Sequence, residues 1–166
     1  MITIRDYKES DSVQVGILIA DTYSQFNLTF ASPEEQAKLL GPFAYARSVE
    51  IKHRDAIAKV IRATMVYVAE DGDEIVGVLR GRPGRLQSLF VSGTRHKQGI
   101  GRTLAEHYEA GCIKNGAPPV KVAATLYAVA FYRKLGYKKT TGVRPGWSFE
   151  GMGLLYQPMK KILVND

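Results

Sequence analysis

Cysteine is nearly missing from this sequence of 166 residues, which contains only Cys112. One thiol excludes an internal disulfide and any metal cluster built from several cysteines. Cys112 lies on the apolar stripe of a helix expected over residues 100–114, so packing in the core is favoured over catalysis. No apolar run approaches the ~20 residues of a membrane span. The charged N-terminal stretch lacks the apolar segment of a secretory signal, so we expect a cytoplasmic protein.

Two common phosphate-binding signatures and the usual metal-ligand spacings are also missing. A dinucleotide fingerprint would need a third glycine at the place of Leu104, after Gly99 and Gly101. The Gly-Lys-Ser/Thr of a nucleotide-binding P-loop does not occur either. His53 and His107 have no partner residue at ligand spacing, and we assign both to structure or surface. The sequence therefore predicts no metal.

Acidic residues are outnumbered by basic ones, 16 against 23, which gives a formal net charge of +7. Such a balance fits a nucleic-acid binder, an anionic membrane surface, a small phosphate-bearing ligand, or a solvated basic face without a partner. The basic residues are dispersed and not interleaved with aromatic ones, so we expect no nucleic-acid partner. We expect no membrane partner either.

The hydrophobic content of 45% allows one sizeable core, and no repeat, low-complexity tract or linker divides the chain. We expect one α+β domain over residues 1–166. Residues 142–153 hold four glycines and are expected to form a long, mobile loop, and residues 80–85 a turn. Helices are expected over residues 12–24, 32–40, 53–62, 100–114 and 128–135. Strands are expected over residues 1–7, 64–69, 75–79, 86–91, 120–124, 137–141 and 154–159.

The stretch Gln98-Gly99-Ile100-Gly101-Arg102 stands between an expected strand and an expected helix. A glycine turn that opens into a helix leaves backbone N–H groups without intrahelical partners, at the positive end of the helix dipole. Phosphate groups bind at such helix starts. Arg95, Lys97 and Arg102 supply positive charge nearby. The stretch therefore predicts a phosphate site.

Two motifs in these elements resemble those of the GCN5-related N-acetyltransferase (GNAT) family. The family's acyl-CoA signature is Arg or Gln, two residues, Gly, one residue, then Gly or Ala, and it falls on residues 96–101. The second motif, Phe-Tyr, three residues, Gly-aromatic, falls on residues 131–137. His96 stands where Arg or Gln is usual, and Thr125 stands where many members carry Asn.

The resemblance implies the acyl-CoA acyltransferase fold. That fold is a mixed, mostly antiparallel sheet of about seven strands, splayed between strands 4 and 5 and flanked by about four helices. It also implies acetyl-CoA as the acyl-donor cosubstrate, with its pantetheine arm on the fourth strand and its pyrophosphate on the glycine turn. The cosubstrate-binding residues implied are Leu89, Phe90, Val91, His96, Lys97, Gln98, Gly99, Ile100, Gly101, Arg102 and Tyr132.

The function implied is direct transfer of the acetyl group to a primary amine in a ternary complex, with Tyr132 as the general acid. No general base is identifiable. The candidates weighed are Gln87 and Ser88, which lie in the right strand but are poor bases, Glu70 at the end of a neighbouring strand, and Glu150 in the late loop. Deprotonation of the amine through water stays open. The acceptor is a small-molecule or peptide amine of unidentified structure. Polar or aromatic residues near the expected acceptor segments are Asn27, Phe30, Tyr67, Trp147 and Phe149.

The absent base and Thr125 keep an alternative open, a catalytically weakened CoA-binding regulatory module of the same fold. The resemblance also leaves a homodimer open.

Overall fold

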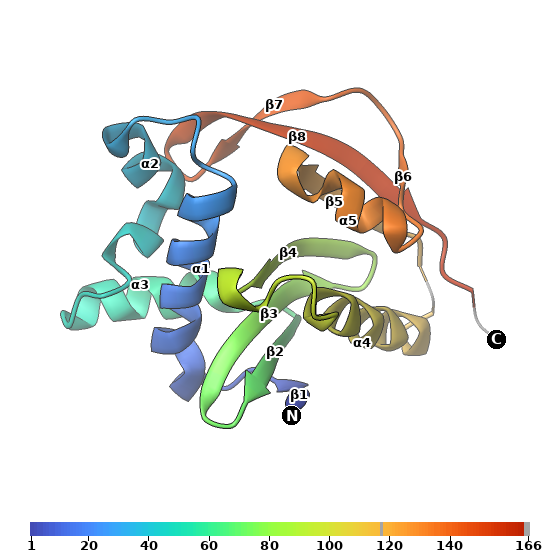
Figure 1. Cartoon of the computed structure of the whole chain (residues 1–166), viewed down its shortest axis with the longest axis horizontal. Helices are drawn as coiled ribbons and strands as arrows, with labels where there is room; N and C mark the ends of the chain where they lie inside the picture. Colours follow the sequence, from blue (N-terminus) through green and yellow to red (C-terminus); the bar gives the residue numbers. More distant parts are fainter. Residues whose placement is uncertain (117, 165–166) are drawn as a thin grey trace.

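The computed structural model describes residues 1–116 and 118–164 (Figure 1), which form an α+β fold with five α-helices and an eight-stranded sheet. The strand order is β1-β2-β3-β4-β5-β8-β6, with β7 pairing only with β8. The α-helices are α1 (Ser12–Phe26), α2 (Pro33–Leu40), α3 (Ile51–Ile61), α4 (Ile100–Lys114) and α5 (Val129–Lys134). The strands are β1 (Ile2–Asp6), β2 (Met65–Asp71), β3 (Glu74–Arg82), β4 (Arg85–Val91), β5 (Val120–Thr125), β6 (Lys138–Lys139), β7 (Arg144–Ser148) and β8 (Gly151–Lys161).

Helix α2 begins where its local sequence predicts. The Ser32 hydroxyl accepts a hydrogen bond from the Glu35 N–H at 3.3 Å, and the Glu35 carboxylate accepts one from the Ser32 N–H at 3.2 Å. Pro33 occupies the first turn, where no backbone donor is needed. This capping box satisfies two N–H groups that the helix itself leaves unpaired.

Strands β2, β3 and β4 form an antiparallel meander, and β1 pairs antiparallel with β2. The turn between β3 and β4 is shorter than predicted, because the strands stay paired as far as Arg82 and Arg85. Only Pro83 and Gly84 remain in the turn, and Gly84 adopts a φ of 82° that glycine tolerates without strain. The cross-strand pairing therefore extends further than the local Gly and Pro content suggests.

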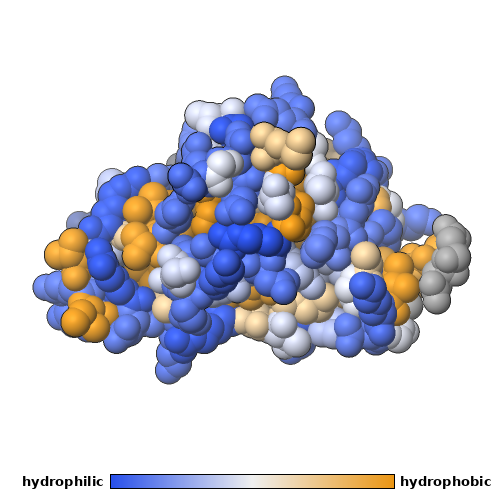
Figure 2. All heavy atoms as spheres, turned by 90° about the horizontal axis from the view of Figure 1, so that it is seen from below, coloured by the Kyte–Doolittle hydropathy of each residue, from blue (hydrophilic) through white to orange (hydrophobic). Residues whose placement is uncertain are grey.

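Two cores lie on opposite faces of this meander. Helices α1 and α3 bury Val15, Ile19 and Ile57 against one face, with Val68 and Val78 of the sheet. Helix α4 covers the other face, and α5 packs into the same core, which contains the fully buried Tyr108. Figure 2 shows the side opposite the β7–β8 ribbon, which is mostly hydrophilic with smaller hydrophobic groups between.

The prediction of a long loop over residues 142–153 is wrong, because most of these residues pair in an antiparallel hairpin. Strand β7 pairs antiparallel with β8, with Trp147 opposite Met152, and β8 begins at Gly151. The two strands form a long ribbon that ends beside α2 (Figure 1). Strand β7 pairs only with β8 in the described sheet, and an edge strand is where proline is tolerated, as Pro145 is here.

The strand expected over residues 137–141 is much shorter, since only Lys138 and Lys139 pair with β8. Tyr137 before them is buried, and its hydroxyl donates to the Glu109 carboxylate at 2.9 Å. One further backbone hydrogen bond to β8 follows, from the Thr140 N–H to the Pro158 carbonyl at 3.1 Å.

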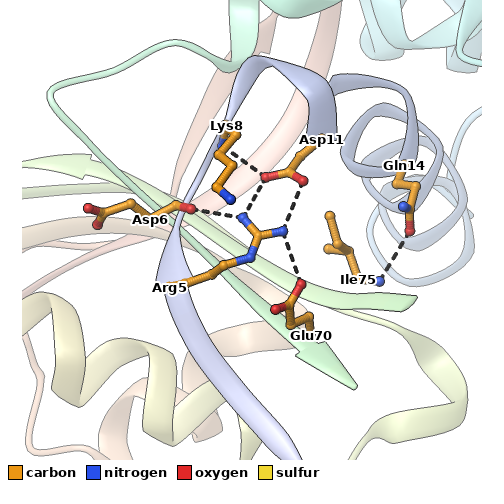
Figure 3. A network of polar contacts seen from close by, with 7 residues as sticks. All are labelled: Arg5, Asp6, Lys8, Asp11, Gln14, Glu70 and Ile75. Atoms are coloured by element: carbon orange, nitrogen blue, oxygen red, sulfur yellow. Dashed lines mark hydrogen bonds and ion pairs between the residues drawn. The ribbon is translucent and has the colours of Figure 1, made fainter. Parts of the chain in front are cut away.

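A buried ion-pair network fixes the N-terminal strand (Figure 3). The Arg5 guanidinium donates to both Asp11 oxygens, at 2.8 and 3.0 Å, and lies 3.0 Å from a Glu70 carboxylate oxygen. Asp11 also accepts from the Lys8 N–H at 2.8 Å and is 6% exposed. The network ties β1 to the start of α1 and to β2. It also gives Glu70, one of the candidate bases, a structural partner.

Candidate active site at the splay of β4 and β5

Strands β4 and β5 run parallel but pair at only two positions, Arg85 with Lys121 and Leu86 with Val122. Beyond Leu86 the strands separate, while β4 remains paired with β3 as far as Val91. This confirms the splay that the family resemblance implies. The side of β4 that faces the gap has no neighbouring strand, so its backbone is open to a ligand that pairs like a strand.

A cavity of about 800 Å³ passes through this gap. Its walls come from both cores: Leu89, Val91 and Phe131 pack on the α4 side, and Ile19 and Phe43 pack on the α1 side. The cavity therefore connects the two faces of the sheet.

The structure brings nearly all predicted cosubstrate residues to this cavity. Gln98 is the exception: its side chain is exposed, and it does not line the cavity. The predicted residues that do line it are Leu89, Phe90, Val91, His96, Lys97, Gly99, Ile100, Gly101, Arg102 and Tyr132.

The glycine turn leads into α4 with the geometry of an anion site. Gly99 is the N-cap residue with a φ of 81°, and an added Cβ there would meet no atom within 4 Å. The first intrahelical donor is the Thr103 N–H, which bonds the Gly99 carbonyl at 3.0 Å. The N–H groups before Thr103 are left without intrahelical acceptors and lie at the positive end of the dipole. The turn therefore offers open backbone donors to a phosphate group.

The three basic side chains near the turn differ in whether they already form ion pairs with carboxylates. Arg95 lies 2.8 Å from the Asp71 carboxylate and 3.6 Å from Glu74. Arg102 lies 3.5 Å from Glu106, one helical turn later. Lys97 has no ion-pair partner among the described residues, and it adopts a φ of 64° that is unusual for a residue with a side chain. Lys97 is therefore the most available cation for a phosphate.

His96 takes part in an aromatic cluster at the mouth of the gap. Its Nε2 lies 2.8 Å from the Val91 carbonyl oxygen, and its ring centroid is 4.6 Å from that of Phe26. Phe26 also stacks on Tyr127, with centroids 5.1 Å apart. The cluster joins the end of α1 to the segments after β4 and β5. Sequence reasoning missed this role, because the three residues lie far apart in the chain.

Tyr132 is buried, and its side chain borders the cavity. Its ring packs edge-on against Phe131 and Tyr137, at centroid distances of 5.1 and 5.4 Å. Its hydroxyl has no hydrogen-bond partner within the described residues, and burial raises its pKa well above the ordinary tyrosine value. The phenol therefore keeps its proton at neutral pH.

Two hydrogen-bonded links tie α1 to distant segments of the cavity wall. The Thr125 hydroxyl donates to the Asn27 side-chain oxygen at 2.6 Å. The Tyr23 hydroxyl donates to Ser148 at 2.7 Å, and the Ser148 hydroxyl donates to the Leu39 carbonyl at 2.8 Å. No local signal marks Tyr23 or Ser148, since the pair is separated by 125 positions.

Comparison with known proteins decides the family. A family model described as an acetyltransferase (GNAT) domain matches residues 18–163. The chain belongs to the GNAT family. It is an acetyl-CoA-dependent N-acetyltransferase, whose acceptor is not identified by these comparisons.

Several relatives show the extent of the likeness. Peptidyl-lysine N-acetyltransferase YjaB of Salmonella typhimurium is 30% identical over 127 residues, which span 69% of this chain and 84% of that protein. A GCN5-related N-acetyltransferase from Rhodopseudomonas palustris has a TM-score of 0.77 at 22% identity, over 97% of this chain and 95% of the other. PaiA N-acetyltransferase from Thermoplasma acidophilum, solved in complex with coenzyme A, has a TM-score of 0.71 at 17% identity, over 98% and 99%.

Some of the residues that the sequence suggests for the acceptor site or as a general base line the cavity of this GNAT domain, and others do not. Asn27 and Phe149 line the cavity, whereas Phe30, Tyr67 and Trp147 do not. Of the candidate bases, Gln87 and Ser88 line it, and Glu70 and Glu150 do not. In the described part of the chain we find no group of three or more potential metal ligands and no helix able to span a membrane.

Proposed function

We propose that this GNAT domain transfers the acetyl group directly from acetyl-CoA to a primary amine bound in the same cavity. One observation carries the proposal: the cavity runs without interruption from the start of α4, past Tyr132, to the face covered by α1. No cysteine is among the described residues that line it, and Cys112 is fully buried in the α4 core. A covalent acyl-cysteine step is therefore not supported.

The chain's residues fit the cosubstrate group by group. The open N–H groups at the start of α4 suit a pyrophosphate, and Lys97 adds charge. The unpaired side of β4 over Leu89, Phe90 and Val91 suits an amide-containing arm that pairs with the backbone. Acetyl-CoA supplies the activated acetyl group as a thioester. Backbone N–H groups near Phe90 or Val91 are the candidates to stabilise negative charge that develops on the acetyl oxygen.

Tyr132 is our candidate for the general acid that protonates the departing thiolate. Its raised pKa keeps the phenol protonated, and no described residue accepts a hydrogen bond from its hydroxyl, which leaves the O–H group available to a bound ligand. Phe131 of α5 and Tyr137, which follows that helix, pack against the ring and hold it in place.

Initial rates and protein mass test direct transfer. With both substrates varied, lines that intersect in a double-reciprocal plot support a ternary complex, whereas parallel lines indicate a covalent acetyl-enzyme. Incubation with acetyl-CoA alone should leave the mass of the protein unchanged. Saturable acetyl-CoA binding without transfer to any amine in a broad panel would favour the regulatory module instead.

The likeness to a peptidyl-lysine N-acetyltransferase makes a peptide lysine one candidate acceptor. A homodimer and a cytoplasmic location stay predictions, which sedimentation and cell fractionation test.

A further inference from the structure

The part of the cavity on the α1 face holds a partly buried cation, Arg80. It lies on β3 directly opposite Ser88 of β4, one position before Leu89. Both residues line the cavity, with Val60 of α3 beside them. This part lies away from the phosphate turn, and it is the part that cosubstrate bound to the turn and to β4 leaves for the acceptor.

The charged side chains that line the cavity are all basic. Among the described residues that line it, none is aspartate or glutamate. The basic residues that line it are Arg80, Arg95, Lys97, Arg102 and Lys134. All of these except Arg80 lie near the turn or on α5, so Arg80 alone sets the charge of the acceptor end.

Arg80 has no carboxylate partner within the described chain. Its Nε donates to the Ile61 carbonyl at 3.0 Å, an Nη2 hydrogen to the Val60 carbonyl, and an Nη1 hydrogen to the Ser88 hydroxyl at 3.4 Å. A guanidinium has five N–H donors, so hydrogens on both terminal nitrogens remain without a described partner. Burial lowers the pKa of Arg80, and no nearby carboxylate opposes that shift.

The carbonyls of Val60 and Ile61 belong to the last turn of α3, so Arg80 also caps that helix. Capping explains two of its contacts but not the third, which is long and crosses from β3 to Ser88 of β4 at the cavity wall. A partly buried positive charge with no described carboxylate beside it is balanced when an anion binds in the cavity.

Resting on the proposed function, we propose that the acceptor amine carries its own anionic group, a carboxylate or a phosphate, and that Arg80 binds this group. A planar guanidinium matches both anions with paired N–H donors. A polycationic amine would meet Arg80 and no acidic side chain in the described wall, so such acceptors are disfavoured.

Matched pairs of acceptors, one anionic and one neutral, test the preference for an anionic group on the unmodified protein. The carboxylate arm compares β-alanine with β-alaninamide, and the phosphate arm compares 2-aminoethyl phosphate with 2-aminoethanol. Spermidine serves as the polycationic probe, and a peptide with one lysine and no acidic group as the neutral one. We expect kcat/KM to be at least about tenfold higher for the anionic member of one pair. The amide has the lower amine pKa, so the carboxylate comparison is biased against the proposal.

The Arg80→Gln variant then assigns the preference to this side chain. Glutamine keeps donors for the α3 carbonyls but has no charge, and we expect it to abolish the anionic preference mainly by raising KM. Arg62→Gln is the matched control, because Arg62 follows the same helix end but pairs with Glu9 on the surface. Arg62→Gln should keep the preference.

Binding of products separates failure of this inference from failure of the proposed function. Calorimetry of the protein loaded with coenzyme A should show tighter binding of N-acetyl-β-alanine than of its amide, or of the N-acetylated aminoethyl phosphate than of N-acetylethanolamine. No saturable binding of coenzyme A contradicts the proposed function. Two results overturn the inference. The first is normal coenzyme A binding together with a kcat/KM for β-alaninamide and 2-aminoethanol, spermidine or the neutral peptide that equals or exceeds that for the anionic acceptors. The second is a preference for anionic acceptors that Arg80→Gln leaves unchanged. If Arg80→Gln does not fold, the paired acceptors on the unmodified protein decide.

Discussion

Leu86 and Val122 are the last residues at which β4 and β5 pair, and the strands diverge from that point. Both side chains are buried, so the point of divergence is fixed in the core. The backbone of residues 87–91 beyond it faces the cavity on one side. The splay is thus a rigid feature of the sheet and not a loose strand end.

Acetyl-CoA binding should therefore slow amide hydrogen exchange at two separated segments, residues 87–91 and residues 97–102. The first segment gains partners in the gap, and the second gains a phosphate acceptor. Amides of β1, which lies on the far edge of the sheet, are the internal control. Protection confined to other segments would place the cosubstrate elsewhere.

Gly101→Ala should weaken acetyl-CoA binding about tenfold, which calorimetry measures. An added Cβ at Gly101 would lie 3.0 Å from the Phe131 ring, so the ring must shift in the cavity wall. Gly142→Ala is the matched control, because a Cβ there meets nothing within 4 Å. Equal dissociation constants for both variants and the parent protein would argue against a close fit at this turn.

Gly41→Ala should disturb the acceptor end of the cavity and spare the cosubstrate end. Gly41 has a φ of 54°, and an added Cβ would overlap the Phe149 ring at the tip of the β7–β8 hairpin. We expect a loss of about 2 kcal/mol in unfolding free energy and a raised KM for the acceptor, with an unchanged dissociation constant for acetyl-CoA. Unchanged stability and KM would show that the hairpin tip is loosely held.

Asp11→Asn should lower the unfolding free energy by about 2–3 kcal/mol at neutral pH, because it breaks a buried, doubly hydrogen-bonded pair with Arg5. Asp21→Asn is the matched control: its pair with Arg47 has the same geometry but is solvent-exposed, so we expect a loss below about 1 kcal/mol.

Arg5 lowers the pKa of the Asp11 carboxyl below its usual value. A carboxyl with a depressed pKa in the folded state stabilises the protein above its unfolded pKa of about 4 and loses that contribution as the pH falls further. Urea unfolding at pH 7 and below pH 4 should therefore show the difference between Asp11→Asn and the parent shrinking in acid. A difference that is constant or grows would contradict the ion-pair account.

The features predicted correctly from sequence are those with local causes or a motif. Ser32, Pro33 and Glu35 mark the start of α2 within one turn, and Gly99 with Gly101 marks the start of α4. The splay was expected only through the family resemblance, because no local pattern distinguishes paired from separated parallel strands.

The features that were missed depend on contacts between distant residues. Strand β7 has the glycine and proline content of a loop, and it is a strand because β8 pairs with it. Arg80 gave no signal in sequence, since its position in the cavity follows from the register of β3 against β4.

Tyr132 is the residue on which the proposed chemistry depends most. Tyr132→Phe removes one oxygen and keeps the ring between Phe131 and Tyr137, so the fold and the cavity should be retained. Tyr127→Phe is the control, because Tyr127 also lines the cavity but has an exposed side chain. Tyr127→Phe should keep kcat within a few-fold of the parent.

The most direct measurement is kcat together with the acetyl-CoA dissociation constant for Tyr132→Phe, once an acceptor is in hand. The account predicts that kcat falls by roughly 10²–10⁴, the usual contribution of a general acid, while the dissociation constant stays the same. A Tyr132→Phe protein that turns over at the parent rate would contradict the assignment of Tyr132 as the proton donor.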